Sequence, residues 1–209
     1  MRKRHYIFLI VLTAFFLLFR FIGQMGINSP DEFFVIKVID GDSFELEGRG
    51  KVRLLGIDTP EKGDLLYDSA KSFLSSLILN KQVTLKFGSR KRDGYGRLLA
   101  YTYRDSILIN ERILQAGLAN VYLFPDNFQD RDLLERLLNA QRQAILDTLG
   151  IWANPYNPES HYIGNSKTYR FHRPDCKSVE NIPDSRKIVY TDRVEPFFEG
   201  LSPCRNCKP

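Results

Sequence analysis

Cysteine is absent from the first 175 of the 209 residues, and the chain holds three in all, Cys176, Cys204 and Cys207. No disulfide bond can therefore form within residues 1–175, so a domain there has to fold on its hydrophobic core alone. An odd number of cysteines also cannot pair off completely. The cysteine content therefore favours a metal site over a disulfide framework in the last part of the chain.

The middle of the chain has no excess of basic over acidic residues. The net charge is +5, but residues 31–160 hold 17 basic and 19 acidic side chains. The positive charge comes from residues 1–30, with four basic and no acidic side chains, and from residues 161–209, with nine and six. Bulk charge therefore gives no argument for nucleic-acid binding, and any attraction for phosphate must be local. The run Arg90–Arg92 beside Arg97 is one candidate, although such a run equally suits a solvated loop.

The apolar run near the N-terminus is short for a membrane span. Residues 7–19 follow the basic flank of residues 2–4, and as a helix they would extend about 20 Å against a bilayer core of about 30 Å. Extension to Ile27 supplies the length but includes Arg20 and Gln24. The run lacks a following small-x-small cleavage site, which favours an uncleaved signal-anchor, and a cleaved signal peptide is the alternative. Either way we expect residues 1–30 to direct export, with the rest of the chain anchored outside the cell membrane or secreted.

Residues 31–153 combine strand and helix patterns typical of an α+β domain. We expect strands over residues 34–38, 44–47, 51–55, 82–87 and 98–103, joined by turns rich in Gly and Asp. We expect helices over residues 68–79, 109–116 and 130–150. In the last helix Asp130 should cap the start, Gly150 should end the helix, and the packed face should be Leu134, Leu138, Ile145 and Leu149. Five strands with three helices permit a small OB-type barrel.

The remaining chain divides at a proline-containing segment. Asn154-Pro155-Tyr156-Asn157-Pro158 should stay extended, because two prolines oppose helix formation. We therefore predict a linker over residues 154–161 and a compact unit over residues 162–209 that is too small for a large core.

Three short blocks bring charged residues onto neighbouring elements of the central domain. They are Val35–Ser43, Val52–Glu61 and Asp93–Arg97. Carboxylates are the ligands that hard cations such as Ca²⁺ prefer, and an arginine fork matches two phosphate oxygens at once. Each residue alone is equally compatible with a turn or with surface charge. Together they are what hydrolysis of a phosphodiester with a divalent cation requires.

The ordered blocks resemble the staphylococcal nuclease (thermonuclease) family, from about Val35 to Trp152. The resemblance also includes Gly117-Leu118-Ala119 and Gly150-Ile151-Trp152. It implies an OB barrel and a calcium-dependent nuclease that hydrolyses DNA or RNA and leaves 3′-phosphate ends. By this resemblance Asp42 and Asp58 bind one Ca²⁺ through their carboxylates, and Thr59 binds it through its backbone carbonyl.

The same resemblance gives the remaining site residues their roles. Arg53 and Arg97 would hold the scissile phosphate and stabilise the charge of the transition state, and Glu61 would orient or deprotonate the attacking water. The substrate contacts would be Tyr95, Tyr122 and Phe124. Phe124 stands where a tyrosine occurs in the best-known member, Gly94 where a lysine occurs and Ser43 where threonine is usual. These departures affect affinity and base preference rather than the chemistry, and Tyr122 and Phe124 also suit packing at the barrel edge.

The C-terminal unit carries two pairs of soft ligands. His172 and Cys176 lie four residues apart, and Cys204 and Cys207 lie three apart. Four such ligands in two close pairs suit tetrahedral Zn²⁺, which would stabilise a small module. The alternatives are a Cys204–Cys207 disulfide with one free thiol, or a redox pair. The unit resembles the four-cysteine metal-binding module of Ada-type DNA-repair proteins, with His172 in place of one cysteine.

Two other functions compete with the nuclease. An OB barrel can bind nucleic acid without cutting it, and a zinc module can serve as an adaptor on the cell surface. The joint presence of Arg53, Glu61 and Arg97 favours catalysis, because a pure binder needs no carboxylate to activate water. We expect DNA or RNA as substrate, a membrane contact through the N-terminal segment, no protein partner and a monomer.

Overall fold

The computed structural model describes residues 31–124 and 130–209. The membrane helix predicted within residues 1–30 lies outside these ranges. Among the described helices, none has the length and apolar character needed to cross a bilayer. Residues 32–209 form one compact unit.

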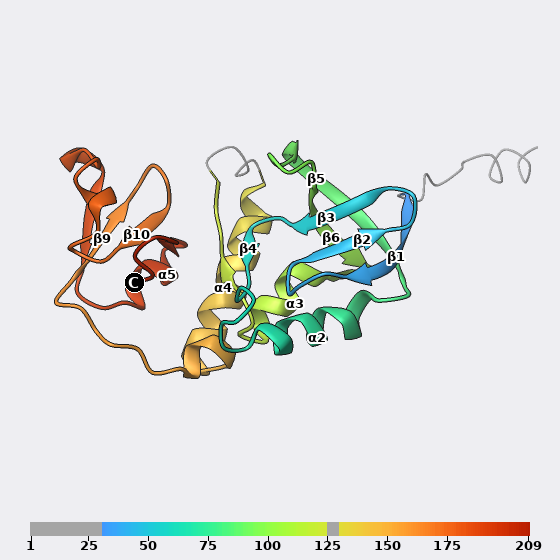
Figure 1. Cartoon of the computed structure of the whole chain (residues 1–209), viewed down its shortest axis with the longest axis horizontal. Coiled ribbons are helices and arrows are strands. Elements are labelled where there is room, and N and C mark those ends of the chain that lie inside the picture. The colour runs from blue at the N-terminus through green and yellow to red at the C-terminus, as the bar shows by residue number, and fades with distance from the viewer. Residues whose placement is uncertain (1–30, 125–129) are drawn as a thin grey trace, which may run out of the picture. The chain divides into compact units, whose positions relative to one another are not determined.

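A closed barrel of five strands forms the larger part of this unit (Figure 1). The strands are β1 (Glu32–Val38), β2 (Ser43–Leu46), β3 (Gly50–Leu54), β5 (Gln82–Arg92) and β6 (Leu98–Arg104). They pair antiparallel in the order β3-β2-β1-β5-β6, and a parallel pairing of β3 with β6 closes the sheet. The short β7 (Ile107–Leu108) follows β6. The predicted α+β fold with a five-stranded barrel is confirmed.

Apolar side chains at every second strand position fill the barrel interior. Phe44 and Leu46 on β2 and Val52 and Leu54 on β3 are buried, and Phe44 lies opposite Val52 in the register. Side chains at every second position of a strand share one face, so both strands direct their apolar residues to the same side. The position between Val52 and Leu54 therefore points away from the core, and Arg53 occupies it.

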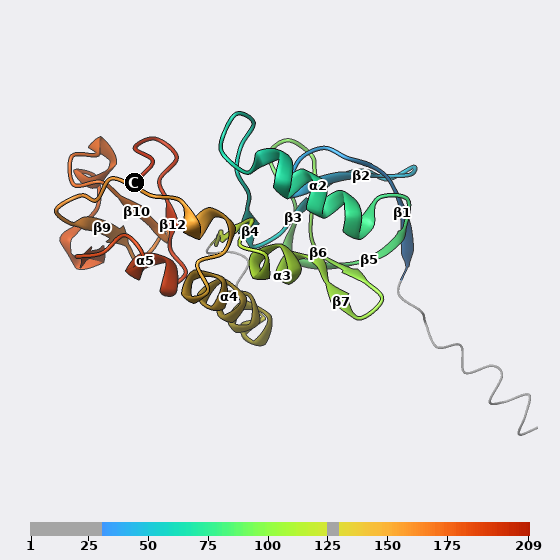
Figure 2. The ribbon, with the colours of Figure 1, turned by 90° about the horizontal axis from the view of Figure 1, so that it is seen from below.

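Three helices pack against the barrel, as predicted. They are α2 (Tyr67–Ile78), α3 (Ile109–Gln115) and α4 (Arg131–Leu146). Helix α3 lies between the other two in both views (Figures 1 and 2). Their buried faces include Leu74, Ile113 and Leu137, which join the barrel residues in one hydrophobic core.

Two boundaries differ from the prediction by more than two residues. Strand β5 continues to Arg92, which pairs with Leu98, so part of the expected loop is an extended hairpin. Helix α4 ends at Leu146, because the chain already turns to a positive φ of 54° at Thr148. Asp130 caps α4 as predicted and accepts from the backbone N–H of Leu133 at 3.0 Å.

The packed face of α4 was predicted only in part. Leu138 is buried, but Leu134 and Ile145 are half-buried and Leu149 is exposed. The buried residues of the helix are Leu133, Leu137, Leu138, Ala140, Gln141 and Ala144. The helix contacts α3 on one side and the C-terminal segment on the other, so its buried surface is wider than one leucine stripe.

The C-terminal segment, residues 162–209, adds a small sheet to the unit. Strands β9 (Tyr162–Asn165), β10 (Arg170–His172), β11 (Lys187–Tyr190) and β12 (Ser202–Pro203) pair in the order β11-β9-β10-β12. The helical elements are α5 (Glu195–Phe198) and the 3-10 turns η2 (Gly150–Ala153), η3 (Lys177–Val179) and η4 (Asp184–Arg186). A second hydrophobic cluster consists of Tyr162, Phe171, Tyr190, Phe197 and Leu201.

The C-terminal segment is bonded to the barrel through α4. Trp152 packs edge-on against Phe197, with ring centroids 4.8 Å apart. The buried Gln141 side chain accepts from the backbone N–H of Val121 and donates to the backbone carbonyl of Phe197, both at 2.6 Å. Val121 belongs to β8 (Asn120–Val121), which pairs with β4 (Ile57–Asp58). The buried Gln141 amide thus joins the β4–β8 strand pair to the C-terminal segment.

Candidate active site

A tight turn between β1 and β2 places Asp42 against the loop after β4. A Cβ atom at Gly41 would lie 2.7 Å from both the Ala70 Cβ and the Thr59 Oγ1, so only glycine allows this approach. The buried Asp42 carboxylate accepts from the backbone N–H and the hydroxyl of Thr59, each at 3.1 Å through Oδ2. The turn and the loop, 17 residues apart, are therefore held together by one carboxylate.

Arg53 lies between the two aspartates that the sequence singled out. Its Nε is 3.1 Å from Oδ1 of Asp42, and its Nη2 is 2.7 Å from Oδ1 of Asp58. The Nη1 donates to the backbone carbonyls of Leu54 and Ile57 at 2.7 and 2.8 Å. These four contacts fix the guanidinium at the edge of β3, where the alternation of the strand places it outside the core.

The carboxylates around Arg53 influence one another. Burial and the charge of Asp42 raise the pKa of Asp58 above its ordinary value, although Arg53 and Arg205 act in the opposite direction. Burial and the same neighbour raise the pKa of Asp40, which accepts from the backbone N–H of Asp42 at 3.1 Å. Asp40 is thus a third carboxylate of this cluster, which the sequence interpretation left out.

Arg97 is oriented by a separate aspartate in the β5–β6 turn. Its Nε donates to Oδ2 of Asp93 at 2.7 Å, and its Nη1 donates to the hydroxyl of Ser43 at 3.4 Å. Partial burial acts to raise the pKa of Asp93, but hydrogen bonds from Arg97 and from the Tyr95 backbone outweigh it and lower the pKa. Asp93 therefore stays ionised and holds Arg97 toward β2.

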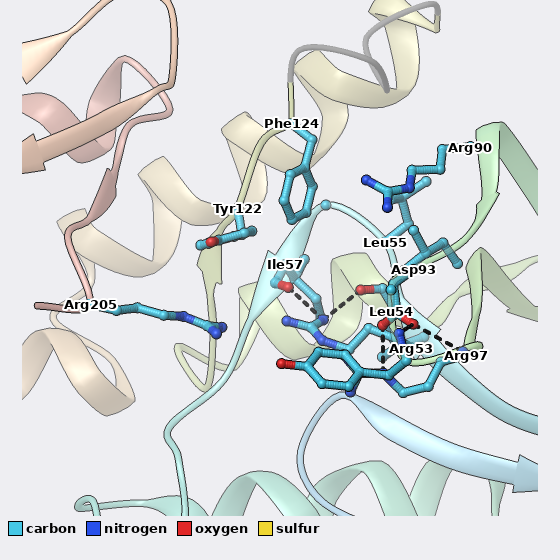
Figure 3. Close-up of a pocket in the computed structure, with 14 residues that line it drawn as sticks. Arg53, Leu54, Leu55, Ile57, Arg90, Asp93, Arg97, Tyr122, Phe124 and Arg205 are labelled. Atoms are coloured by element: carbon cyan, nitrogen blue, oxygen red, sulfur yellow. Dashed lines mark hydrogen bonds and ion pairs between the residues drawn. The ribbon is translucent and has the colours of Figure 1, made fainter.

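A cavity of about 290 Å³ opens between these elements (Figure 3). Five of the predicted site residues line it, namely Arg53, Arg97, Tyr95, Tyr122 and Phe124. The Tyr122 and Phe124 rings meet edge to face at 5.0 Å, and the Cζ of Arg97 lies 5.6 Å from the centre of the Tyr95 ring. Tyr95 is 89% exposed, so its ring is available to a ligand.

Glu61 stands at the rim rather than in the lining of the cavity. Its side chain is 72% exposed, and its Oε1 is 3.7 Å from Nη2 of Arg205. Its backbone N–H donates to Oδ2 of Asp64 at 3.2 Å. Asp42, Asp58 and Thr59 are also not part of the lining. Asp42 and Asp58 bond the lining residue Arg53, Asp58 also bonds Arg205, and Thr59 bonds Asp42.

Sequence reasoning missed Arg205, which also lines the cavity. It belongs to the Cys204–Cys207 motif, and its Nη2 is 2.9 Å from Oδ1 of Asp58. The two residues are 147 positions apart, and no local pattern relates them. Arg90, named in the sequence only as part of a basic run, lies on the other side of the cavity.

A second cluster brings together the four predicted zinc ligands. The ligand atoms of His172, Cys176, Cys204 and Cys207 all lie within 4.8 Å of one another, and three of the residues are buried. All three cysteines are free thiols, and the Cys176 Sγ is 3.5 Å from Nδ1 of His172. Thiolates around a tetrahedral Zn²⁺ at about 2.3 Å lie about 3.8 Å apart, so a small contraction of this cluster would suit zinc.

The fold and the pocket define a closed-barrel protein with two arginines held by aspartates at the barrel mouth. Residues 51–154 match the family described as staphylococcal nuclease homologue. A thermonuclease of Staphylococcus hyicus is 32% identical over 140 residues, which cover 62% of this chain and 81% of the relative. An uncharacterised endonuclease of Haemophilus influenzae is 32% identical over 155 residues, covering 71% of this chain and 82% of the relative. The chain belongs to the staphylococcal nuclease homologue family.

Similarity also extends to a protein whose name gives no activity. An uncharacterised protein of Methanocaldococcus jannaschii is 34% identical over 149 residues, with 56% of this chain and 70% of the relative covered.

Proposed function

We propose that the protein is an exported, calcium-dependent nuclease that hydrolyses phosphodiester bonds of DNA or RNA. The observation that carries this proposal is the pair of arginines in one cavity. Arg53 is fixed by Asp42 and Asp58, and Arg97 is fixed by Asp93. The names thermonuclease and endonuclease of the similar proteins support the same reaction.

The acidic residues beside Arg53 suit a hard divalent cation. Asp42 and Asp58 lie close enough to share one guanidinium, and the Thr59 carbonyl follows directly in the chain. Two carboxylates and one carbonyl, completed by waters, suit the loose geometry of Ca²⁺ better than the strict octahedron of Mg²⁺. These three residues would hold Ca²⁺, whose positive charge would polarise a phosphoryl oxygen and a bound water.

Arg53 and Arg97 bind the scissile phosphate in this proposal. Both guanidiniums stay charged at any working pH. Arg97 keeps N–H groups on both Nη atoms and can donate two parallel hydrogen bonds to phosphate oxygens, whereas Arg53 keeps one Nη2 hydrogen beside its bonds to Asp42, Asp58, Leu54 and Ile57. Attack by water adds negative charge to those oxygens in the transition state. Preorganised donors at such a position contribute about 2.7 to 4 kcal/mol each, so loss of either arginine should cost a factor of hundreds in rate.

Glu61 orients the attacking water and accepts its proton. Its exposed place at the rim gives water direct access to the carboxylate. The water oxygen forms a bond to phosphorus while the bond to the 5′-oxygen breaks. The 5′-oxygen leaves with the bonding electron pair and takes a proton from solvent, so the products end in a 3′-phosphate and a 5′-hydroxyl. Tyr95, Tyr122 and Phe124 contact the nucleotide, and because every base offers a face for stacking, the preference for sequence should be weak.

The His172, Cys176, Cys204 and Cys207 cluster holds a structural Zn²⁺ in this proposal. All four positions of a tetrahedral ion are supplied by protein, which leaves none for a reacting water. We further propose that residues 31–153, 154–161 and 162–209 are the nuclease domain, a linker and the zinc module of a monomer. Residues 1–30 direct export and either anchor the chain in the cell membrane or are cleaved to release it.

The direct test is cleavage of single-stranded DNA and RNA by the purified full-length chain, with Ca²⁺ or with a calcium chelator. We expect Ca²⁺-dependent cleavage that falls at least about a hundredfold in Glu61→Gln. Glu47→Gln changes an exposed glutamate in the turn after β2; it is the matched control and should cleave at the wild-type rate. A folded protein that binds DNA but does not cut it with Ca²⁺ or other divalent cations would favour a non-catalytic binding module instead.

A further inference from the structure

The C-terminal segment places a third arginine at the nuclease site. Arg205 extends below Tyr122 toward Arg53 (Figure 3). Its Nη2 is 2.9 Å from Oδ1 of Asp58 and 3.7 Å from Oε1 of Glu61. Its guanidinium therefore approaches both a proposed calcium ligand and the proposed base, although it comes from the other end of the described chain.

The backbone that carries Arg205 is held firmly. Cys204 is buried, and its N–H donates to the carbonyl of Phe171 at 2.9 Å. The N–H of Lys208 donates to the carbonyl of Cys204 at 2.9 Å, which closes the turn around Arg205. Cys204 and Cys207, the two cysteines of that turn, belong to the four-residue metal cluster. A metal bound there would fix the arginine's backbone.

The position of this segment against the barrel is also fixed by specific contacts. Arg170 on β10 donates to the carbonyl of Leu123 at 3.1 Å, and its Cζ lies 3.7 Å from the centre of the Tyr122 ring. The Cζ of Arg205 lies 5.3 Å from the same ring. Two arginines of the C-terminal segment thus contact one aromatic residue of the cavity, and the segment forms part of the cavity wall.

The ion pairs of Arg205 contribute too little to the stability of the fold to explain why the arginine lies here. The Arg205 side chain is 59% exposed, with Asp58 at 17% and Glu61 at 72%, and ion pairs with such access to water stabilise a fold weakly. The guanidinium can therefore exchange a carboxylate for a phosphate at little cost. A polynucleotide chain that places one phosphate between Arg53 and Arg97 brings the neighbouring phosphates to the edges of the cavity, where Arg205 lies.

We propose that Arg205 is a substrate-binding residue that donates to a phosphate flanking the scissile one, and that the His172–Cys176–Cys204–Cys207 metal site positions it. This inference rests on the proposed nuclease function. It gives the proposed zinc module a part in the substrate site.

The first test is binding of a fluorescein-labelled single-stranded DNA 12-mer to the full-length chain in the Glu61→Gln background, over a range of salt concentrations. Arg205→Gln should weaken binding about ten- to a hundredfold, as expected for loss of a hydrogen bond between charged groups. The slope of log affinity against log salt should become shallower by about 0.7, the value for one phosphate contact on a single strand. Arg205→Lys should keep the slope, because it keeps the charge.

The second test separates binding from chemistry in the otherwise wild-type protein. Arg205→Gln should raise KM for the 12-mer about tenfold or more and leave kcat within about threefold. Lys187→Gln is the matched control, because it removes one positive charge from the same segment at a residue that pairs with Asp184. It should change neither the salt slope nor KM.

The third test concerns positioning by the metal site. Cys204→Ser should weaken binding as much as Arg205→Gln. The affinity of the double variant for the 12-mer should equal that of the single variant with the lower affinity. An additive double variant would overturn the positioning role. Arg205→Gln leaves the four ligands intact, so the first two tests hold whether or not Cys204→Ser folds.

The outcomes distinguish this inference from the proposed function. An unchanged salt slope in Arg205→Gln would overturn the substrate contact. A lowered Ca²⁺ requirement with unchanged KM would also overturn it and make Arg205 a competitor of calcium for Asp58. If the wild type binds the 12-mer without cleaving it, the nuclease proposal fails, whereas the binding arm still decides whether Arg205 contacts the strand.

Discussion

Among the residues that the structure describes, the barrel with its helices buries 27 apolar side chains in one core, whereas the C-terminal segment buries five in its own cluster. The first region contains no cysteine, and the second contains all three. A large core can offset the loss of chain entropy on folding, but a segment of about 50 residues seldom can without a metal, a disulfide or a partner surface. The second region packs on the surface of α4, and its His/Cys cluster could hold a metal ion as a further support.

The largest expected effect follows removal of the proposed Zn²⁺ from the C-terminal segment. Structural zinc contributes about 10–16 kcal/mol in small zinc-finger peptides, about as much as five buried side chains supply at about 1.5–3 kcal/mol each. A zinc chelator should therefore release amide protection in β9 and β10 and leave protection in β1, β2 and β3 unchanged, as measured by hydrogen exchange. Excess Zn²⁺ should restore the protection. Continued protection of β9 and β10 without metal would show that the contacts with α4 suffice.

The second largest effect concerns the hydrophobic core of the barrel. Phe44→Ala removes a fully buried ring from the core and should lower the free energy of unfolding by about 3–5 kcal/mol in a urea titration. Phe34→Ala is the matched control, because that ring is 40% exposed on the neighbouring strand and should cost less than about 1 kcal/mol. Equal losses in the two variants would contradict the inward face assigned to β2.

The junction between the two regions gives an intermediate effect. Gln141→Leu leaves the N–H of Val121 buried without its partner, whereas the carbonyl of Phe197 still accepts from the N–H of Gly200 at 3.0 Å. An unpaired buried group costs about 1–3 kcal/mol, so the free energy of unfolding should fall by about 1–3 kcal/mol. Gln143→Leu, which loses only an exposed contact with Asp147, should lie within about 0.5 kcal/mol of wild type. If the two variants are equally stable, the buried amide does not join the regions.

The smallest effect concerns the cap of α4, the helix that both regions share. Asp130→Ala should cost about 1 kcal/mol, and Asp130→Asn, which can still cap, only a few tenths. Hydrogen bonds from Lys86 and Leu133 lower the pKa of Asp130. Its contribution is therefore full above the unfolded pKa of about 3.9 and is lost as pH falls through the lower folded value. Acid unfolding curves of the three proteins should differ above that range and converge below it.

Sequence reasoning was most successful where position along the chain determines position in space. The blocks around Asp42, Arg53 and Asp58 lie on adjacent strands and turns, so strand alternation and turn glycines suffice to bring them together. The same reasoning gave the five strands, the three helices and the cap at Asp130. These features depend on local patterns that repeat every two or four residues.

The parts that were missed depend on contacts between distant segments. The buried face of α4 is set by two different neighbours, so a single leucine stripe misplaced Leu134, Ile145 and Leu149. Arg205 reaches Asp58 only because the C-terminal sheet packs on α4 and near Tyr122. The sequence contains the Cys-x2-Cys turn that carries this arginine, but it contains no signal for where that turn lies.

The packing of Trp152 against Phe197 has an optical consequence. Trp152 is the only tryptophan in the chain, and its indole nitrogen is buried without a hydrogen-bond partner among the described residues. An indole that water does not reach emits at shorter wavelength than a hydrated one. The intrinsic fluorescence of the unaltered protein should therefore shift to the red when the C-terminal segment leaves the barrel, without any attached dye.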